Sequence, residues 1–298
     1  MLYVYPVLEP KSTINMKKIT TLLLSLLAIS AIAEVSPTEK AALLQFYEAT
    51  NGRQWKTTWD ISGPVENFYG VTIENDKVVG ISLPNNNISG QFPEVLTQLT
   101  SLETLNLFRN DLSGSLPTSI GNLTSLKHLN ISFNKLTGTL PVSIAKLTNL
   151  ESMELYMNNL TGSIPSEIGQ LKKLENLSLF NNSLEGELPT QLYALTQLKV
   201  LMLSSNNFSG RLSYEIENLK QLENLSLFEN NFIGQVPFEI EKLKNLKELN
   251  ISYNKFTGLI SYAMASKDSF QMTMLDDKGL AVKLRLLSDA TGLVGTPD

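Results

Sequence analysis

The sequence contains no cysteine, so the chain can form neither a disulfide bond nor a thiolate metal site, and it cannot carry a lipid on a cysteine. Histidine occurs once, as His128, which we expect to point outward from a strand with no carboxylate beside it. No Ser/His/Asp set can be built without that residue, and zinc-protease, phosphate-binding and kinase motifs do not occur. We therefore predict a protein that is not an enzyme and needs no cofactor or metal ion.

Basic residues are also fewer than acidic ones. The chain has 24 lysines and arginines against 29 aspartates and glutamates, which gives a net charge of −5. Binding to nucleic-acid phosphates requires clustered lysine and arginine. This balance therefore disfavours nucleic acid as a partner.

A long apolar run occurs only near the N-terminus, in residues 16–33 (MKKITTLLLSLLAISAIA). Two lysines, an apolar core and the small residues Ala31-Ile32-Ala33 are typical of a cleaved secretory signal peptide. A membrane anchor is the alternative, but the run is short for crossing a bilayer. We predict export to the extracellular space or cell surface (or periplasm), with no membrane span in the mature chain. Because the signal begins at Met16, we interpret residues 1–15 as a mis-assigned start.

The rest of the sequence is dominated by a 24-residue pattern that occurs eight times across residues 78–266. The clearest copy is Leu126–Asn149 (LKHLNISFNKLTGTLPVSIAKLTN). Every copy has an asparagine at one position and a glycine four residues later, with no insertion between copies. One copy alone is too small to bury its apolar face, so its stability must come from stacking on its neighbours. The pattern predicts a repeat solenoid.

Each position in the repeat has a physical interpretation. Leu129 and Ile131 lie two residues apart, so they point to the same side of a short strand, and the equivalent strands are expected to form one parallel sheet. A buried amide costs about 1–3 kcal/mol if it is unpaired, so we predict an asparagine ladder that bonds the backbone of each bend. Proline stands three residues after the glycine in every copy but two. Ser213 and Ser261 take its place in those two copies, where we expect looser coils. The ladder residues are Asn86, Asn110, Asn134, Asn158, Asn182, Asn206, Asn230 and Asn254.

The copies match the pattern LxxLxLxxNxLxGxIPxxIGxL almost letter by letter, so about two-thirds of the chain resembles the plant-type leucine-rich-repeat family. The resemblance implies an α/β repeat fold: a right-handed curved solenoid with a parallel β-sheet on the concave face and 3-10 or irregular turns on the convex face. Members of the family serve as binding solenoids in cell-surface receptors and in secreted inhibitors of wall-degrading enzymes. A fold hosts many functions, so the resemblance names no ligand.

Residues 34–77 resemble the N-terminal cap of this family. The capping box Ser36-Pro37-Thr38-Glu39 predicts a helix that runs to about Thr50. Two cysteines usually brace such a cap, but Phe68 and Val71 lie in that region of this chain. We therefore expect packing to replace the bridge, and we interpret the chain as an exported bacterial member with a cysteine-free cap.

Residues 267–298 follow the last copy and no longer fit the pattern. Apolar residues alternate over 270–274 and again over 280–286, with a turn signal at 276–279 between them. This pattern predicts a β-hairpin that caps the exposed end of the solenoid. The alternative is a tail that is not native to the family.

The positions that the repeat leaves free beside each strand carry many aromatic and methionine side chains. Exposed aromatics at this density often mark an interaction surface, whereas the alternative is that each ring merely packs on its neighbours. The predicted ligand-binding residues are Phe108, Arg109, Phe133, Tyr156, Met157, Phe180, Met202, Phe228 and Tyr253.

Three functions are consistent with this surface. The favoured one is a non-catalytic recognition module that binds a protein partner on the concave face. The second is a polysaccharide-binding protein in which the rings stack on sugars and amide side chains bind hydroxyls. The third is a structural spacer without a specific ligand. The amides in the second function are those of Asn106, Asn130, Asn176, Asn224 and Asn250.

Overall fold

The computed structural model describes residues 35–267, 269–276 and 278–287. The predicted signal peptide and the start of the chain (residues 1–33) lie outside these ranges. None of the helices in the described part has the length and hydropathy needed to cross a bilayer.

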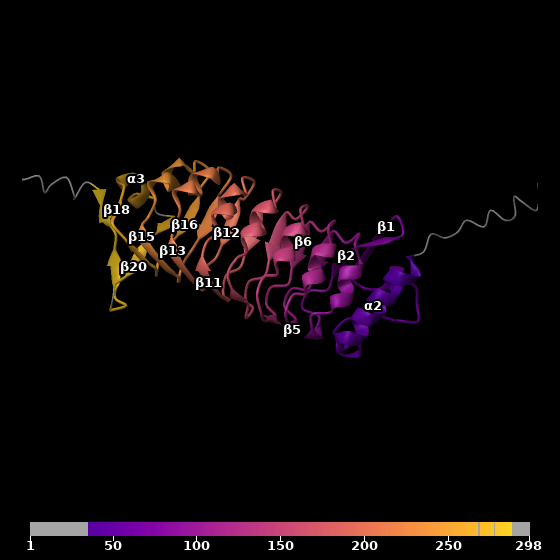
Figure 1. Cartoon of the computed structure of the whole chain (residues 1–298). Coiled ribbons are helices and arrows are strands. Elements are labelled where there is room, and N and C mark those ends of the chain that lie inside the picture. Colours follow the sequence, from indigo (N-terminus) through magenta and orange to yellow (C-terminus); the bar gives the residue numbers. More distant parts are fainter. Residues whose placement is uncertain (1–34, 268, 277, 288–298) are drawn as a thin grey trace, which may run out of the picture. The chain divides into compact units, whose positions relative to one another are not determined.

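The N-terminal cap opens with helix α2 (Pro37–Ala49), which lies at the indigo end of the repeat stack in Figure 1. It begins where the capping box predicts. The Ser36 hydroxyl accepts a hydrogen bond from the backbone N–H of Glu39 at 3.3 Å and donates one to the carboxylate of the same residue at 2.9 Å. The first bond satisfies an N–H group that a helix start leaves without a partner.

An aromatic core fills the cap behind this helix. The Trp59 and Phe68 rings stack with their centroids 4.7 Å apart, and Trp55 meets Trp59 edge to face at 4.9 Å. Both indole N–H groups donate to backbone carbonyls, those of Thr50 and Tyr69, at 2.9 Å. Phe68 is buried, so packed rings form the core of this part of the cap.

A ten-stranded sheet then runs through the stack of coils (Figure 1). Its first two strands, β1 (Val71–Glu74) and β2 (Lys77–Ser82), pair antiparallel, whereas the strands after them pair parallel. The central residue of each repeat strand is buried, as the period of two predicts. These strands are β4 (Thr104–Asn106), β6 (His128–Asn130), β8 (Ser152–Glu154), β10 (Asn176–Ser178), β12 (Val200–Met202), β14 (Asn224–Ser226) and β16 (Glu248–Asn250), and the two-residue strand β19 (Phe270–Gln271) ends the sheet.

Short 3-10 helices form the opposite side of the first seven coils, so the predicted leucine-rich-repeat solenoid is confirmed. Most of these helices follow a proline, which fixes φ and lacks the N–H that a helix start leaves unpaired. They are η3 (Glu94–Gln98), η4 (Thr118–Asn122), η5 (Val142–Lys146), η6 (Ser166–Gln170), η7 (Thr190–Ala194), η8 (Tyr214–Asn218) and η9 (Phe238–Lys242), with η1 (Gly52–Gln54) and η2 (Val65–Asn67) in the cap.

Two serines stand where the other coils carry proline, and each of them caps a helix. The Ser213 hydroxyl accepts a hydrogen bond from the N–H of Glu215 at 3.1 Å and so caps η8. The Ser261 hydroxyl accepts one from Met264 at 3.1 Å and caps helix α3 (Tyr262–Ala265). At these two positions a serine side chain therefore marks the start of the helix, where the other coils have proline.

A second set of parallel strands joins the two sides, which the sequence pattern did not predict. Their residues lie around the repeated glycines, and within each of two sheets the strands of successive coils pair parallel. The strands are β3 (Ser89–Gln91), β5 (Asp111–Gly114) and β7 (Lys135–Leu136) in one sheet, and β9 (Thr161–Gly162), β11 (Ser183–Glu187), β13 (Asn207–Arg211), β15 (Asn231–Gln235) and β17 (Lys255–Thr257) in another.

The repeated asparagines lie in the bends that follow the sheet strands. The Asn134 side-chain amide donates to the carbonyl of Ile131 in its own bend and to that of Leu107 in the preceding coil, both at 3.0 Å. Its side-chain oxygen accepts from the N–H of Leu112, also in the preceding coil, at 2.9 Å. One side chain therefore satisfies backbone groups of two coils.

The same bonds recur from Asn110 to Asn254. Asn86, in the first coil, bonds the cap instead: its oxygen accepts from the N–H of Thr57 at 2.7 Å, and its amide donates to the Thr57 carbonyl at 3.2 Å. The ladder thus begins on the N-terminal cap.

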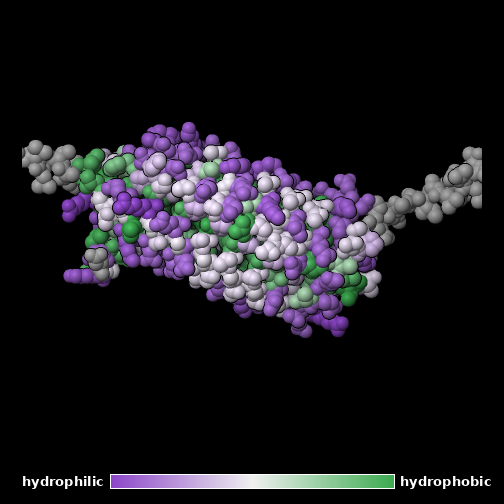
Figure 2. Space-filling model, viewed as in Figure 1, coloured by the Kyte–Doolittle hydropathy of each residue, from purple (hydrophilic) through white to green (hydrophobic). Residues whose placement is uncertain are grey.

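The C-terminal segment departs from the predicted simple hairpin. Residues 270–274 were expected to form one hairpin strand, but β19 instead extends the main sheet beyond the eighth copy by pairing parallel with β16. Strands β20 (Thr273–Leu275) and β21 (Ala281–Lys283) form the antiparallel hairpin, and β22 (Arg285–Leu286) returns to β18 (Leu259–Ile260). Figure 2 shows hydrophobic residues over this end of the molecule. Leu280 and Val282 of the C-terminal segment are exposed.

Candidate functional site

In each repeat strand of the main sheet, the residues on either side of the buried central residue point to one side of the sheet. We call this side the sheet face. Four rings from successive coils are in contact there and form the aromatic patch: Phe108, Phe133, Tyr156 and Phe180. The Phe133 centroid lies 5.4 Å from that of Phe108 and 5.6 Å from that of Tyr156, and Tyr156 stacks on Phe180 at 4.4 Å. Phe133 is 39% exposed and the other three rings are half-buried, so the patch offers apolar surface to solvent.

The aromatic side chains do not form one continuous band. A second pair, Phe228 and Tyr253, lies further along the sheet with ring centroids 5.2 Å apart. The coil between the two groups carries Ser204 and Ser205 at the equivalent positions. Small polar side chains therefore divide the predicted surface into a patch of four rings and a pair.

The remaining predicted residues lie around these rings. Met157 and Phe133 line one shallow depression, and Arg109 is exposed on the coil before Phe133. Met202 lies apart from the patch, on β12, where it borders the hollow described below.

One column of this surface has an unusual backbone conformation that the sequence did not reveal. A bulky residue rarely adopts positive φ, yet Phe133 and Tyr253 have φ of 53° and 57°. The stacked coils hold this bend, because the Phe133 N–H donates to the carbonyl of Tyr156 in the next coil at 3.0 Å. The eight residues of the column are Asn85, Arg109, Phe133, Met157, Asn181, Ser205, Glu229 and Tyr253.

A buried hydroxyl lies within the aromatic patch. Ser132 is fully buried and comes from the coil between those of Phe108 and Tyr156, whose ring centroids are 6.4 Å apart. Burial, followed by the nearby Glu154 carboxylate, raises the pKa of the Tyr156 hydroxyl. The patch thus combines partly exposed rings with a buried hydroxyl.

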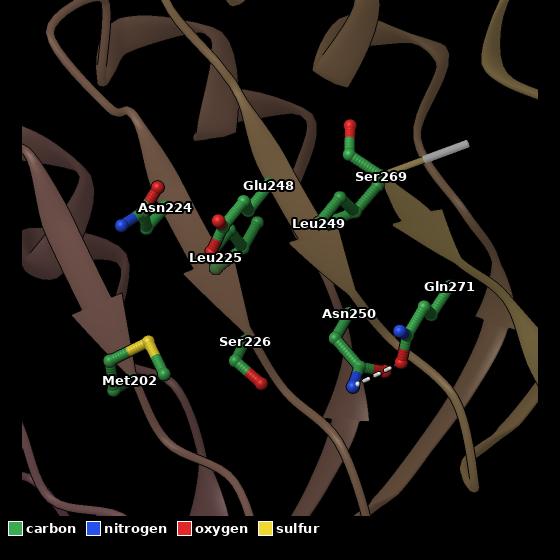
Figure 3. Close-up of a pocket in the computed structure, with 9 residues that line it drawn as sticks. All are labelled: Met202, Asn224, Leu225, Ser226, Glu248, Leu249, Asn250, Ser269 and Gln271. Carbon is green, nitrogen blue, oxygen red and sulfur yellow. Dashed lines mark hydrogen bonds between the residues drawn. The ribbon is translucent and has the colours of Figure 1, made fainter. Parts of the chain in front are cut away.

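A hollow of about 390 Å³ opens on the sheet face near its C-terminal end (Figure 3). It is lined by Met202, Asn224–Ser226, Glu248–Asn250, Ser269 and Gln271. We call it the polar hollow. Asn250 and Gln271 are joined across its rim, where the Asn250 amide donates to the Gln271 oxygen at 2.9 Å. Glu248 is the one ionisable group in the lining, which contains no lysine or arginine.

Charged residues line the start of the strands. Lys127 pairs with Glu103 at 2.6 Å, and Lys199 pairs with Glu175 at 2.7 Å. The partner carboxylates raise the pKa of both lysines. His128, expected to have no carboxylate near it, lies 4.0 Å from Glu151 of the next coil.

Groups of three or more His, Asp or Glu side chains that could hold a metal ion do not occur in the described ranges.

Family models of leucine-rich repeats match most of this architecture. One, described as leucine rich repeat, matches residues 76–136 and 124–184, and another, described as leucine-rich repeat region, matches residues 155–271. Together they span the parallel strands of the sheet and the aromatic patch. The chain is a leucine-rich-repeat protein.

Several solved structures of plant receptors resemble this leucine-rich-repeat protein. The plant peptide hormone receptor RGFR1 in complex with RGF2 is 33% identical with a TM-score of 0.62, over 69% of this chain and 32% of the receptor chain. The Arabidopsis receptor kinase HAESA, in complex with the peptide hormone IDA and the co-receptor SERK1, is 34% identical with a TM-score of 0.61, over 68% and 35%. PEPR1–AtPEP1 is 27% identical with a TM-score of 0.72, over 81% and 38%.

This chain therefore spans about a third of the length of each of these receptor chains. No curated protein sequence matches it significantly.

The polar hollow is the part of the candidate site that the sequence did not predict. The sequence predicts Asn224 and Asn250 as hydroxyl-binding amides and gives no sign that Glu248 lies beside them. The hollow is also lined by Ser269, which precedes β19, and by Gln271, which belongs to β19. This strand lies outside the repeat pattern. The alternation of residues 270–274 was the available signal, but it fits a hairpin strand as well as an added sheet strand.

Proposed function

We propose that this leucine-rich-repeat protein is an exported, non-catalytic recognition module that binds a protein partner on the sheet face. The observation that carries this proposal is the aromatic patch, in which four rings from successive coils make contact and remain partly exposed. Rings of this kind are enriched at binding hot spots, because they bury a large apolar area with few rotatable bonds. The complexes of RGFR1 and HAESA with peptide hormones support the same type of ligand for this fold.

Polysaccharide binding is a second candidate, and hydrogen bonding on the sheet face weighs against it. Asn130 donates to Glu154 at 3.1 Å, Asn176 donates to Ser152 at 3.1 Å, and Asn250 donates to Gln271 at 2.9 Å. Amides that already have protein partners gain less from binding sugar hydroxyls. A structural spacer, the third candidate, would not need partly exposed rings on one side of its sheet.

Export is part of the proposal, together with a bacterial source for the cysteine-free cap. If residues 16–33 are a cleaved signal peptide, the product found outside the cytoplasm of an expressing bacterium should begin at Glu34. Mass spectrometry of the intact exported protein measures this directly. A product that keeps residues 16–33, or one found only in the cytoplasm, would contradict the proposal.

The binding proposal is tested by capture with a matched pair of baits. Both baits begin at Glu34, and in one of them Phe108, Tyr156, Phe180 and Phe228 are all changed to serine. We expect the unchanged bait to retain one defined protein from a cell-surface extract, and the variant to lose at least about tenfold in affinity for it, because hot-spot rings carry much of the binding energy. A third bait carrying Tyr214→Ser, an exposed aromatic residue on η8, is the control and should bind normally.

Each other outcome has a distinct meaning. Equal capture by all baits would move the site away from the aromatic patch. Binding to a glycan array in the absence of any protein partner would favour the polysaccharide function. Circular dichroism of each bait must show the same folded spectrum, so that a lost partner is not mistaken for a lost fold.

A further inference from the structure

The inference concerns the polar hollow and rests on the proposed function, because it specifies the chemistry of the partner. We propose that the hollow binds a lysine or arginine side chain of the partner, while apolar residues of the same extended segment lie on the neighbouring rings. The partner is thus a peptide segment that combines positive charge with apolar side chains.

The charge of the hollow is the first argument. Glu248 is exposed, and its carboxylate has no lysine, arginine or hydrogen-bonding side chain as a partner among the described residues. The adjacent Lys247 pairs with Glu223 at 2.5 Å instead, and Lys199 pairs with Glu175 at 2.7 Å. These two lysines, which precede β12 and β16 in the chain, are therefore already paired, and Glu248 leaves the lining with a negative charge that an incoming cation can neutralise.

The chemistry of the lining is the second argument. Asn224 makes no side-chain hydrogen bond to a described residue, and Figure 3 shows it beside Glu248 on the adjacent strand. An ammonium or guanidinium group needs several acceptors, and the carboxylate with the Asn224 oxygen supplies them. A phosphate or carboxylate ligand would be repelled by Glu248. A divalent metal would find a single carboxylate where such ions require several oxygen ligands.

The position of the hollow is the third argument. Phe228 follows Ser226 by two residues, so both side chains point to the same side of the sheet, about 7 Å apart along the chain. Phe228 and Tyr253 form the second aromatic pair, so apolar surface begins directly beyond the hollow. A volume of about 390 Å³ is within the range of ligand pockets and accommodates one long basic side chain.

The test uses an array of extended synthetic peptides in matched pairs. Each pair is identical except that arginine in one peptide is replaced by citrulline in the other, which keeps the shape and removes the charge. The unchanged Glu34–Asp298 protein should bind a set of arginine peptides that also contain aromatic or aliphatic residues, at least about tenfold more tightly than their citrulline partners. This preference should weaken as salt concentration rises.

Two variants locate the effect. Glu248→Gln keeps the size of the side chain and should abolish the preference for arginine over citrulline. Glu187→Gln makes the same change on β11, away from the sheet face, and should leave the preference intact. Both residues are exposed, so both variants should fold.

The remaining outcomes separate this inference from the proposed function. If arginine and citrulline peptides bind equally, or if Glu248→Gln keeps the preference, the inference is wrong, whereas binding through the aromatic patch still stands. If no peptide binds and no protein is captured by the unchanged bait, the proposed function itself fails.

Discussion

Replacement of Asn158 by leucine is expected to lower the free energy of unfolding by at least about 2 kcal/mol, because a buried polar group left without a partner costs about 1–3 kcal/mol. The Asn158 amide donates to the carbonyls of Ile131 and Leu155, both at 3.0 Å. Its oxygen accepts from the N–H of Leu136 at 2.9 Å. Leucine has a similar size but can serve none of these groups.

The adjacent Asn159 supplies the control, since its side chain is exposed and the same change to leucine removes no buried hydrogen bond. Urea unfolding followed by circular dichroism compares the two variants with the unchanged protein. Hydrogen exchange at the Leu136 amide gives a local reading, and we expect faster exchange there only in Asn158→Leu. Equal unfolding midpoints for the two variants would mean that the ladder does not stabilise the coils.

Replacement of Phe208 by serine is expected to destabilise the protein by about 3–5 kcal/mol, the range for loss of a buried aromatic side chain. Phe208 is fully buried and stacks with Phe232, whose ring in turn stacks with Phe256 at 5.9 Å. Serine would leave a cavity between two coils and place a hydroxyl in it. Urea unfolding measures the loss.

Phe180→Ser is the matched comparison, because it makes the same chemical change on the sheet face. Phe180 is half-buried and its main contact is the stacked ring of Tyr156. We expect a cost of no more than about 1.5 kcal/mol, the upper range for one aromatic pair. If Phe180→Ser unfolded the protein as readily as Phe208→Ser, the assignment of the sheet face to solvent would be wrong.

Much of the fold could be predicted because each repeat position faces the same environment in every coil. Leu129 and Ile131 reveal a strand by their spacing, and the recurrence of Asn134 in an apolar run reveals a buried polar role. In this protein the same pattern occurs eight times in register, so it cannot arise from chance composition.

What could not be predicted depends on contacts between positions that the repeat does not specify. The positive φ of Phe133 is imposed by hydrogen bonds to the next coil, while its residue type argues against that conformation. The approach of Glu151 to His128 joins two variable positions in different coils. The polar hollow requires Gln271, whose strand joins the sheet only after the pattern has ended.

The ladder asparagines also bear on how the protein can change its length. From Asn110 to Asn254, each one bonds its own bend and the coil before it, so equivalent coils present interchangeable edges. Duplication or deletion of 24 residues within this region would join the same kinds of edge as before. Evolution can therefore add or remove whole coils, widening or narrowing the sheet face by about 4.8 Å each time, without redesigning the caps.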